Sequence, residues 1–191
     1  MKLFLIRHGQ SEANLKTNYT GQTDVALTEL GRVQAATAGA ILSPYHFDKV
    51  YASDLQRART TCECALPGVE YETLSLLREY DVGRLDGVPI GSVKRIQSDD
   101  PADRPDYTDY GGENARMVCD RARTFLSMLE KQPYDCVAAF SHFGFINCVL
   151  RTVLKTSYEG NRIFTPNCAV HIIEYDGEKW RILALNYGAV V

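Results

Sequence analysis

Residues 3–12 read LFLIRHGQSE, and this stretch decides the fold class of the chain. Four apolar residues end at Arg7 and His8, and Gly9 opens a polar loop behind them. A short apolar run bounded by a turn signal is typical of a buried strand. The run therefore predicts a strand that delivers a cation and an imidazole at its carboxyl end.

The same pattern recurs twice further along the chain. Residues 48–52 lead to Arg57, and residues 136–140 lead to His142. In open α/β sheets, ligands bind outside the carboxyl ends of the strands. These two segments are therefore expected to bring their side chains to the same edge as the cation and imidazole of the first strand, which predicts an anion site containing a reactive nitrogen.

Predicted strands alternate with predicted helices, an order typical of a mainly parallel sheet covered by helices on both faces. The expected fold class is therefore α/β, a three-layer αβα sandwich with a mainly parallel central sheet. Helices are expected from Thr28 to Leu42, from about Asp54, from Glu113 to Lys131 and after Gly144, and a hairpin is expected from Ala169 to Leu185.

The chain has 191 residues, a formal charge of -3 and a pI near 5.8. Its length fits one domain spanning residues 1–191, and its acidic balance argues against nucleic acid as the main partner. The apolar runs are too short for a membrane span, and residues 1–6 are too short for the apolar core of a signal peptide. We expect a cytoplasmic protein that does not bind membranes, and a homodimer is one open possibility.

The six cysteines do not form a disulfide framework in a chain of this length. Cys62 and Cys64 stand two apart, short of the spacing usual for zinc pairs. The others sit among apolar neighbours, so we expect reduced cysteines packed as small hydrophobic side chains. The sequence also shows no carboxylate–histidine cluster with ligand spacing, and no metal site is predicted.

Residues 86–112 interrupt the alternation. Prolines, glycines and aspartates break any long regular element in this segment. It is either a solvated excursion or a flap over the catalytic edge, where specificity is often carried on a rigid scaffold. The residues alone leave both readings open.

The residues at the predicted edge suit phosphoryl transfer, which needs mainly positioning and charge stabilisation. Arg7 and Arg57 carry planar guanidinium groups that match phosphoryl oxygens. Arg59 lies roughly 200° around a helix from Arg57, so both cannot face one pocket. His8 is the expected nucleophile, kept neutral by nearby cations that lower its pKa. His142 is expected to donate a hydrogen bond to the phosphoryl oxygens.

A leaving alkoxide also needs a proton, which a carboxyl group can supply. Glu79, Asp81 and Glu113 all qualify by residue type. The residues alone do not choose among these three carboxylates.

These motifs together resemble the histidine phosphatase superfamily, which contains the cofactor-dependent phosphoglycerate mutases and their phosphatase relatives. The resemblance covers most of the chain, from residue 3 to about residue 147. It is carried, in order, by residues 7–14, 20–24, 27–31, 53–58, 77–79 with Gly83 and Gly87, 111–113 and 141–142.

The resemblance implies the phosphoglycerate mutase-like form of the fold and a reaction that needs neither a metal nor a nucleotide cofactor. It selects Arg57 over Arg59, selects Glu79 over the two rival carboxylates, and favours a flap for residues 86–112. It also implies secondary ligands to the phosphoryl group or the substrate at Asn14, Thr20, Gly21 and Gln22.

The chain departs from the family pattern at four positions. Phe143 stands where a glycine usually follows the second histidine, and Asn147 stands where arginine is frequent. Leu85 replaces a common tryptophan, and Asn114 replaces a common serine. None of these changes removes a proposed catalytic group, but they leave the substrate undetermined.

Three functions fit the residues. The first is a metal-independent phosphatase that hydrolyses small phosphomonoesters through a phosphohistidine. The second is a phosphoglycerate mutase-type phosphoryl transfer; the short span between Gly87 and Gly112 favours the phosphatase, because the mutase branch carries a longer insertion there. The third is a non-catalytic module that binds a phospho-ligand, which needs neither the attacking imidazole of His8 nor the proton donor Glu79.

Overall fold

The computed structural model describes residues 1–93, 100–156 and 163–188, and these contain one six-stranded sheet. The strand order across the sheet is β3-β2-β4-β1-β5-β6. The strands are β1 (Lys2–Arg7), β2 (Lys49–Ala52), β3 (Glu72–Thr73), β4 (Cys136–Ser141), β5 (Val170–Tyr175) and β6 (Trp180–Ala184).

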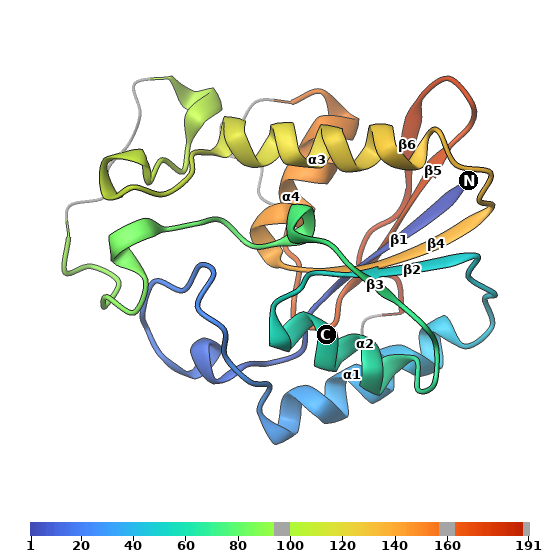
Figure 1. Ribbon diagram of the computed structural model, residues 1–191, viewed down its shortest axis with the longest axis horizontal. Coiled ribbons are helices and arrows are strands. Elements are labelled where there is room, and N and C mark those ends of the chain that lie inside the picture. The colour runs from blue at the N-terminus through green and yellow to red at the C-terminus, as the bar shows by residue number, and fades with distance from the viewer. Residues whose placement is uncertain (94–99, 157–162, 189–191) are drawn as a thin grey trace.

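The register of the sheet aligns the carboxyl ends of three strands. β4 pairs in parallel with β1 on one side and with β2 on the other, and β2 pairs in parallel with β3. Arg7 lies opposite Ser141, and Ala52 lies opposite Phe140. The segments that leave β1, β2 and β4 therefore start side by side, on the left of Figure 1. The predicted hairpin is confirmed, since β5 and β6 pair antiparallel.

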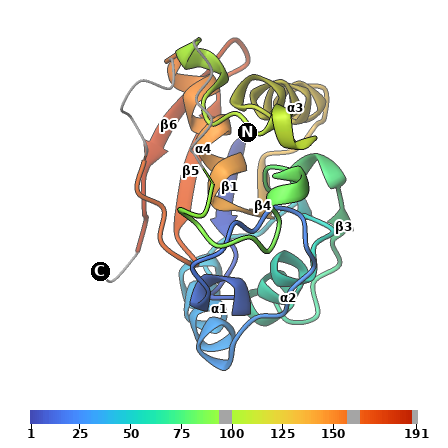
Figure 2. The same cartoon turned by 90° about the vertical axis from the view of Figure 1, so that its left-hand side faces the viewer.

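Helices cover both faces of the sheet (Figures 1 and 2), with α3 and α4 on one face and α1 and α2 on the other. The predicted three-layer αβα sandwich is confirmed. The α-helices are α1 (Glu29–Leu42), α2 (Gln56–Ala65), α3 (Ala115–Leu129) and α4 (Phe143–Leu154). Short 3-10 turns lie at η1 (Glu12–Leu15), η2 (Ser75–Leu77), η3 (Gly83–Leu85), η4 (Pro101–Asp103) and η5 (Thr108–Tyr110).

Each face of the central strand contributes to a separate core. Leu3 and Leu5 pack in the core under α3 and α4, whereas Phe4 and Ile6 pack in the core under α1 and α2. Successive side chains of a strand point to opposite faces, so a strand covered on both sides needs an unbroken apolar run. Burial of both faces of β1 therefore explains the apolar LFLI run at residues 3–6.

Side-chain caps fix where two of the helices begin. The Thr28 hydroxyl accepts a hydrogen bond from the Gly31 amide at 3.0 Å, so α1 begins where the sequence predicts. Asn114 caps α3 in the same way through the Met117 amide at 3.0 Å. Asparagine therefore replaces the serine of the family pattern without loss of the cap.

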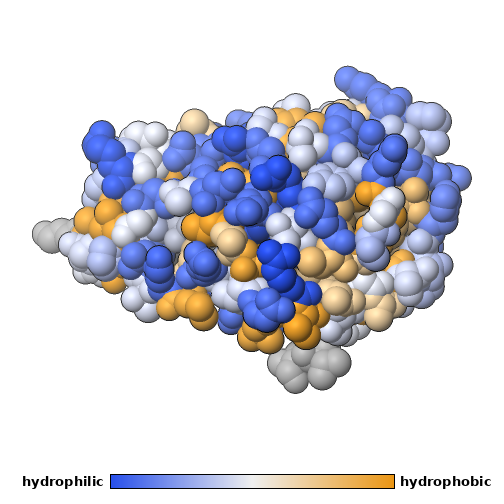
Figure 3. All heavy atoms as spheres, turned by 60° about the horizontal axis from the view of Figure 1, so that its bottom comes forward, coloured by the Kyte–Doolittle hydropathy of each residue, from blue (hydrophilic) through white to orange (hydrophobic). Residues whose placement is uncertain are grey.

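The surface around α1 is mixed in character. Figure 3 looks onto the side that carries α1 in Figure 1, and there the apolar residues lie in small groups among hydrophilic ones. Leu30 and Val33 on this helix are 51% and 57% exposed. Along the described ranges, no helix is both long enough and apolar enough to cross a bilayer. All six cysteines are free thiols, as predicted.

One buried histidine makes the stability of the fold sensitive to acidic pH. His171 lies in β5 with no exposed surface, and its Nε2 is 3.1 Å from the Thr165 hydroxyl. Its Nδ1 accepts from the Asn186 amide at 3.4 Å, so Nε2 carries the proton of the neutral ring. Burial lowers the pKa of His171 to about 4.

We expect the free energy of unfolding to fall as the pH drops from about 6.5 to about 4. The unfolded chain protonates His171 near pH 6.5, whereas the folded protein resists protonation down to about pH 4. The stabilisation is therefore complete above pH 6.5, is lost on acidification, and amounts to about 3 kcal/mol. Urea denaturation at pH 7 and pH 4 should show a smaller loss in His171→Gln, and an equally steep loss in the variant would contradict this assignment.

Candidate active site

The ends of three strands bring four predicted site residues together. Arg7 ends β1 and His8 follows it, Arg57 lies in the first turn of α2 behind β2, and His142 follows β4 as the N-cap of α4. The rings of His8 and His142 have centroids 5.1 Å apart. Arg57 Nε lies 3.2 Å from His142 Nδ1. Figure 2 looks onto this edge of the sheet.

His8 is held in one tautomer. Its Nδ1 lies 2.7 Å from the Gly9 carbonyl oxygen, a contact that requires a proton on Nδ1. The lone pair of the neutral ring is therefore on Nε2, and His8 lines the cavity at this edge. Burial, followed by the nearby charges of Arg57 and Arg7, lowers the pKa of His8 well below its ordinary value. The ring is neutral at pH 7 and can act as a nucleophile.

Arg7 keeps donor capacity for an anion. One of its terminal nitrogens donates to the Thr165 carbonyl at 2.6 Å. Its Nε–H is buried and, among the described residues, has no hydrogen-bond partner. The guanidinium lies over the ring of Phe143, 5.5 Å from the centroid. Burial lowers the pKa of Arg7, and the charge of Glu79 opposes this shift.

Arg57 organises the loop that follows η1. Its two terminal nitrogens donate to the carbonyls of Gly21 and Thr23 at 2.7 and 2.9 Å. Arg57 is 2% exposed and still lines the cavity. Arg59, on the same helix, does not line it. The helical spacing thus separates the two arginines as predicted.

Both nitrogens of His142 have protein partners. Nδ1 accepts from Arg57 at 3.2 Å, and Nε2 lies 2.9 Å from the Ser53 hydroxyl. His142 has no exposed surface and is not among the residues that line the cavity. The predicted donation to phosphoryl oxygens therefore requires one ring nitrogen to give up its protein partner, Arg57 at Nδ1 or Ser53 at Nε2.

Glu79 faces the cavity from the segment that follows η2. Its two carboxylate oxygens accept the backbone N–H groups of Tyr80 and Gly144 at 2.9 and 3.0 Å. A Cβ atom at position 144 would overlap the Glu79 carboxylate, so the chain needs glycine there. Asp81 and Glu113, the rival carboxylates, do not line the cavity.

The four predicted secondary ligands divide into two groups. Asn14 and Thr20 line the cavity, and the Asn14 side-chain oxygen accepts from the amide and hydroxyl of Ser11. Gly21 and Gln22 do not line it. The Gln22 side-chain amide instead donates to the Glu79 carbonyl at 3.2 Å, which places it behind the carboxylate.

The cavity has a volume of about 410 Å³ and is lined by more than the predicted catalytic groups. Tyr19, Tyr107 and Phe143 also line it, and the ring centroids of Tyr19 and Tyr107 are 6.2 Å apart. Two cations, Lys16 and Arg151, line it as well. Sequence reasoning missed both tyrosines, because they stand in loops where no periodicity marks them.

The described part of residues 86–112 contributes Ile90, Pro105 and Tyr107 to the cavity wall, while residues 94–99 lie outside the described residues. Among the residues that the structure describes, no group of three or more metal-ligating side chains is clustered.

A family model for the histidine phosphatase superfamily (branch 1) matches residues 3–188. The chain belongs to this superfamily. It is 29% identical to a broad-specificity phosphatase of Saccharomyces cerevisiae, over 92% of this chain and 80% of the yeast protein. It is 38% identical to a 2,3-bisphosphoglycerate-dependent phosphoglycerate mutase of Cytophaga hutchinsonii, over 62% of this chain and 60% of the mutase.

The fold of this superfamily member matches solved structures over nearly its whole length. A phosphoserine phosphatase from Entamoeba histolytica superposes with a TM-score of 0.84, covering 97% of this chain and 96% of that chain. The sequence identity is 21%, so this likeness concerns the fold alone. The predicted phosphoglycerate mutase-like form of the α/β fold is confirmed.

Proposed function

We propose that the protein is a phosphomonoesterase that works through a phosphohistidine on His8. The observation that carries the proposal is the tautomer of His8. Its Nδ1–H donates to the Gly9 carbonyl, so the lone pair is on Nε2, and the ring lines the cavity. Arg7 and Arg57 line the same cavity and their positive charges act on the His8 ring, and Glu79 is the only carboxylate that lines the cavity within the described ranges. An anion, a neutral nucleophile and a proton donor can meet there.

The geometry supports a reaction in two displacements. In the first, the Nε2 lone pair of His8 attacks phosphorus, the bond from phosphorus to the ester oxygen breaks, and Glu79 gives its proton to the leaving alkoxide. In the second, Glu79 takes a proton from water, and the hydroxide attacks the phosphohistidine. Inorganic phosphate leaves, His8 is neutral again and Glu79 is protonated for the next cycle. Arg7 and Arg57 stabilise the charge on the transferring group.

The short span between Gly87 and Gly112 favours hydrolysis over a mutase reaction, in which the phosphoenzyme must outlive the exchange of substrates. A parallel assay of phosphate release and of phosphoryl transfer between sugar-acid phosphates distinguishes the two. The presence of His8 and Glu79 together favours either reaction over a non-catalytic binding module.

The proposal also covers the location, the substrate and the partners of the enzyme. We propose a cytoplasmic location, a small-molecule phosphomonoester as substrate, and no nucleic-acid or membrane partner. The acidic balance of the chain supports the exclusion of nucleic acid. A single domain over residues 1–191, a specificity role for the described part of residues 86–112 and a homodimer stay predictions.

We expect His8→Ala to abolish both turnover and the phosphoenzyme. The variant removes the nitrogen that bonds to phosphorus, so neither displacement can occur. Rapid quench with a labelled ester should trap an acid-labile adduct in the wild type and none in the variant.

Arg59→Ala is the control for general damage to this edge of the sheet, since Arg59 lies outside the cavity wall. It should retain most of the wild-type activity. Full activity in His8→Ala would exclude the phosphohistidine mechanism.

We expect chelators to leave the activity unchanged. The charge stabilisation that a metal ion supplies in other phosphatases is assigned here to Arg7 and Arg57, which both line the cavity, and to His142. Phosphate release should be measured before and after dialysis against EDTA. A loss that a divalent ion restores would refute this assignment.

We expect Glu79→Gln to lower kcat for alkyl phosphates by about 10²–10⁴-fold, the usual range for general acid catalysis. Nitrophenyl phosphate has a better leaving group and should lose less in the first displacement. Water activation then limits turnover, so the phosphoenzyme should accumulate as a burst of nitrophenol.

Both ester types are to be measured on the same preparation of Glu79→Gln. Equal losses for the two esters, without an accumulated intermediate, would make Glu79 a binding or structural residue. Asp81 and Glu113 would then be the carboxylates to test.

A further inference from the structure

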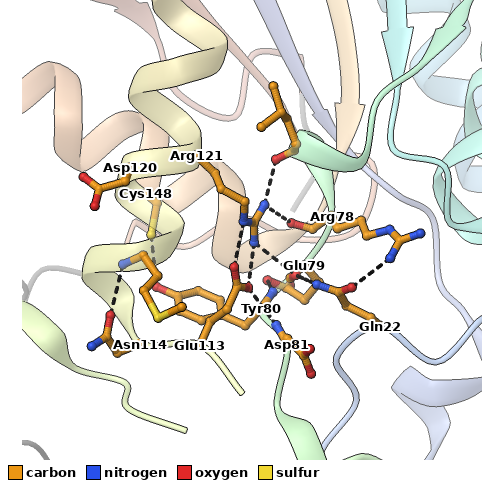
Figure 4. A network of polar contacts seen from close by, with 12 residues as sticks. Gln22, Arg78, Glu79, Tyr80, Asp81, Glu113, Asn114, Asp120, Arg121 and Cys148 are labelled. Atoms are coloured by element: carbon orange, nitrogen blue, oxygen red, sulfur yellow. Dashed lines mark hydrogen bonds and ion pairs between the residues drawn. The ribbon is translucent and has the colours of Figure 1, made fainter. Parts of the chain in front are cut away.

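The main chain that presents Glu79 is held by an arginine outside the cavity. Arg121, on α3, donates through one terminal nitrogen to the carbonyls of Leu76 and Arg78, at 2.7 and 3.1 Å. Its other terminal nitrogen donates to the Glu79 carbonyl at 3.3 Å. Figure 4 shows these contacts converging on one guanidinium. Three carbonyls of the segment are thus tied to one rigid group of a helix.

A carboxylate completes the coordination of this guanidinium. Glu113 accepts from Arg121 Nε and from a terminal nitrogen, both at 2.8 Å. The same carboxylate accepts the Asp81 amide at 2.9 Å. The Arg121–Glu113 pair therefore binds main-chain groups on both sides of Glu79, and its two side chains are only 19% and 15% exposed.

The Glu79 carbonyl has a second donor from a different element. Gln22 donates to it at 3.2 Å, and the Gln22 side-chain oxygen accepts from Arg78 at 3.0 Å. Arg78 is in turn bound to Asp54 through two contacts of 2.7 and 2.6 Å. The residue that carries the proposed acid is therefore clamped from α3 and from the loop after η1, and Figure 4 shows Gln22 and Arg121 reaching it.

The contacts from Arg121, Glu113 and Gln22 hold a segment that has few main-chain hydrogen bonds of its own. Residues 78–82, which follow η2, have no regular secondary structure, so their main-chain groups lack ladder partners. The Glu79 carboxylate must nevertheless lie within hydrogen-bond reach of the leaving oxygen. A misplacement of about 1 Å can cost about 10²-fold in rate.

We propose that Arg121 is a positioning residue for the general acid. It fixes the main chain of Glu79, and so the direction of its carboxylate, without contacting the substrate. This inference rests on the proposed function and adds to it a residue that none of the catalytic motifs contains.

The test is Arg121→Met, which keeps the length of the side chain and removes every donor. We expect kcat for alkyl phosphates to fall about 10²-fold, with a smaller loss for nitrophenyl phosphate. KM and the inhibition constant of inorganic phosphate should change less than threefold, because Arg7 and Arg57 are untouched. A purely structural defect would lower the active fraction and reduce both esters equally.

A double-mutant cycle makes the assignment specific. If Arg121 acts through Glu79, then Arg121→Met should have little further effect on alkyl phosphates in the Glu79→Gln background. Additive losses in the double variant would overturn the inference. Gln22→Met removes the other donor to the Glu79 carbonyl and should shift the same ester ratio to a smaller extent, so it carries the test if Arg121→Met does not fold.

The matched control is Arg123→Met, on the same helix. Arg123 forms an exposed ion pair with Asp120 and its side chain is 58% exposed, so both ester activities should stay at wild-type level. If Glu79→Gln shows the leaving-group effect and the Arg121 and Gln22 variants do not, this inference fails alone. If Glu79→Gln also lacks the effect, the proposed role of Glu79 fails first and the inference falls with it.

Discussion

The structure depends on burying two arginines at one edge of a sheet where, among the residues that the structure describes, neither has a carboxylate partner at hydrogen-bond distance. Arg7 donates to the Thr165 carbonyl, and Arg57 donates to the carbonyls of Gly21 and Thr23. Carbonyls satisfy the N–H groups but supply no counter-charge, so the charge of Glu79, which opposes the lowering of both arginine pKa values, offsets only part of the cost of burial. An anion that enters the cavity adds further negative charge beside the two arginines.

The same field sets the chemistry of the histidine between the arginines. Burial, and after it the charges of Arg57 and Arg7, lower the pKa of His8, so its ring stays neutral and keeps a lone pair for attack. The register of β1 against β4 places His8 beside His142, with ring centroids 5.1 Å apart. Glu79 enters this edge from a separate segment that follows β3 in the chain, and its carboxylate oxygens accept the backbone N–H groups of Tyr80 and Gly144.

The sequence predicted the parts of this site that depend on local pattern. Apolar runs ending in Arg7, Arg57 and His142 predicted one shared edge, because parallel strands place their carboxyl ends together. Capping chemistry at Thr28 predicted the start of α1. Gln22 shows where local pattern fails: its side chain bonds to a main-chain carbonyl 57 positions away, and only tertiary packing determines such a partner. Neither periodicity nor residue type marks it.

Phe143 and Gly144 show how the chain accommodates a departure from its family. The phenylalanine lines the cavity and lies under the Arg7 guanidinium, so its bulk is placed beside the cation that we propose to bind the phosphoryl group. The next residue cannot be large, because a Cβ atom at Gly144 would overlap the Glu79 carboxylate. The first turn of α4 thus offers one position where volume is tolerated and one where it is excluded. Since the tolerated position faces the cavity, a change there alters the space for the substrate while leaving the acid in place.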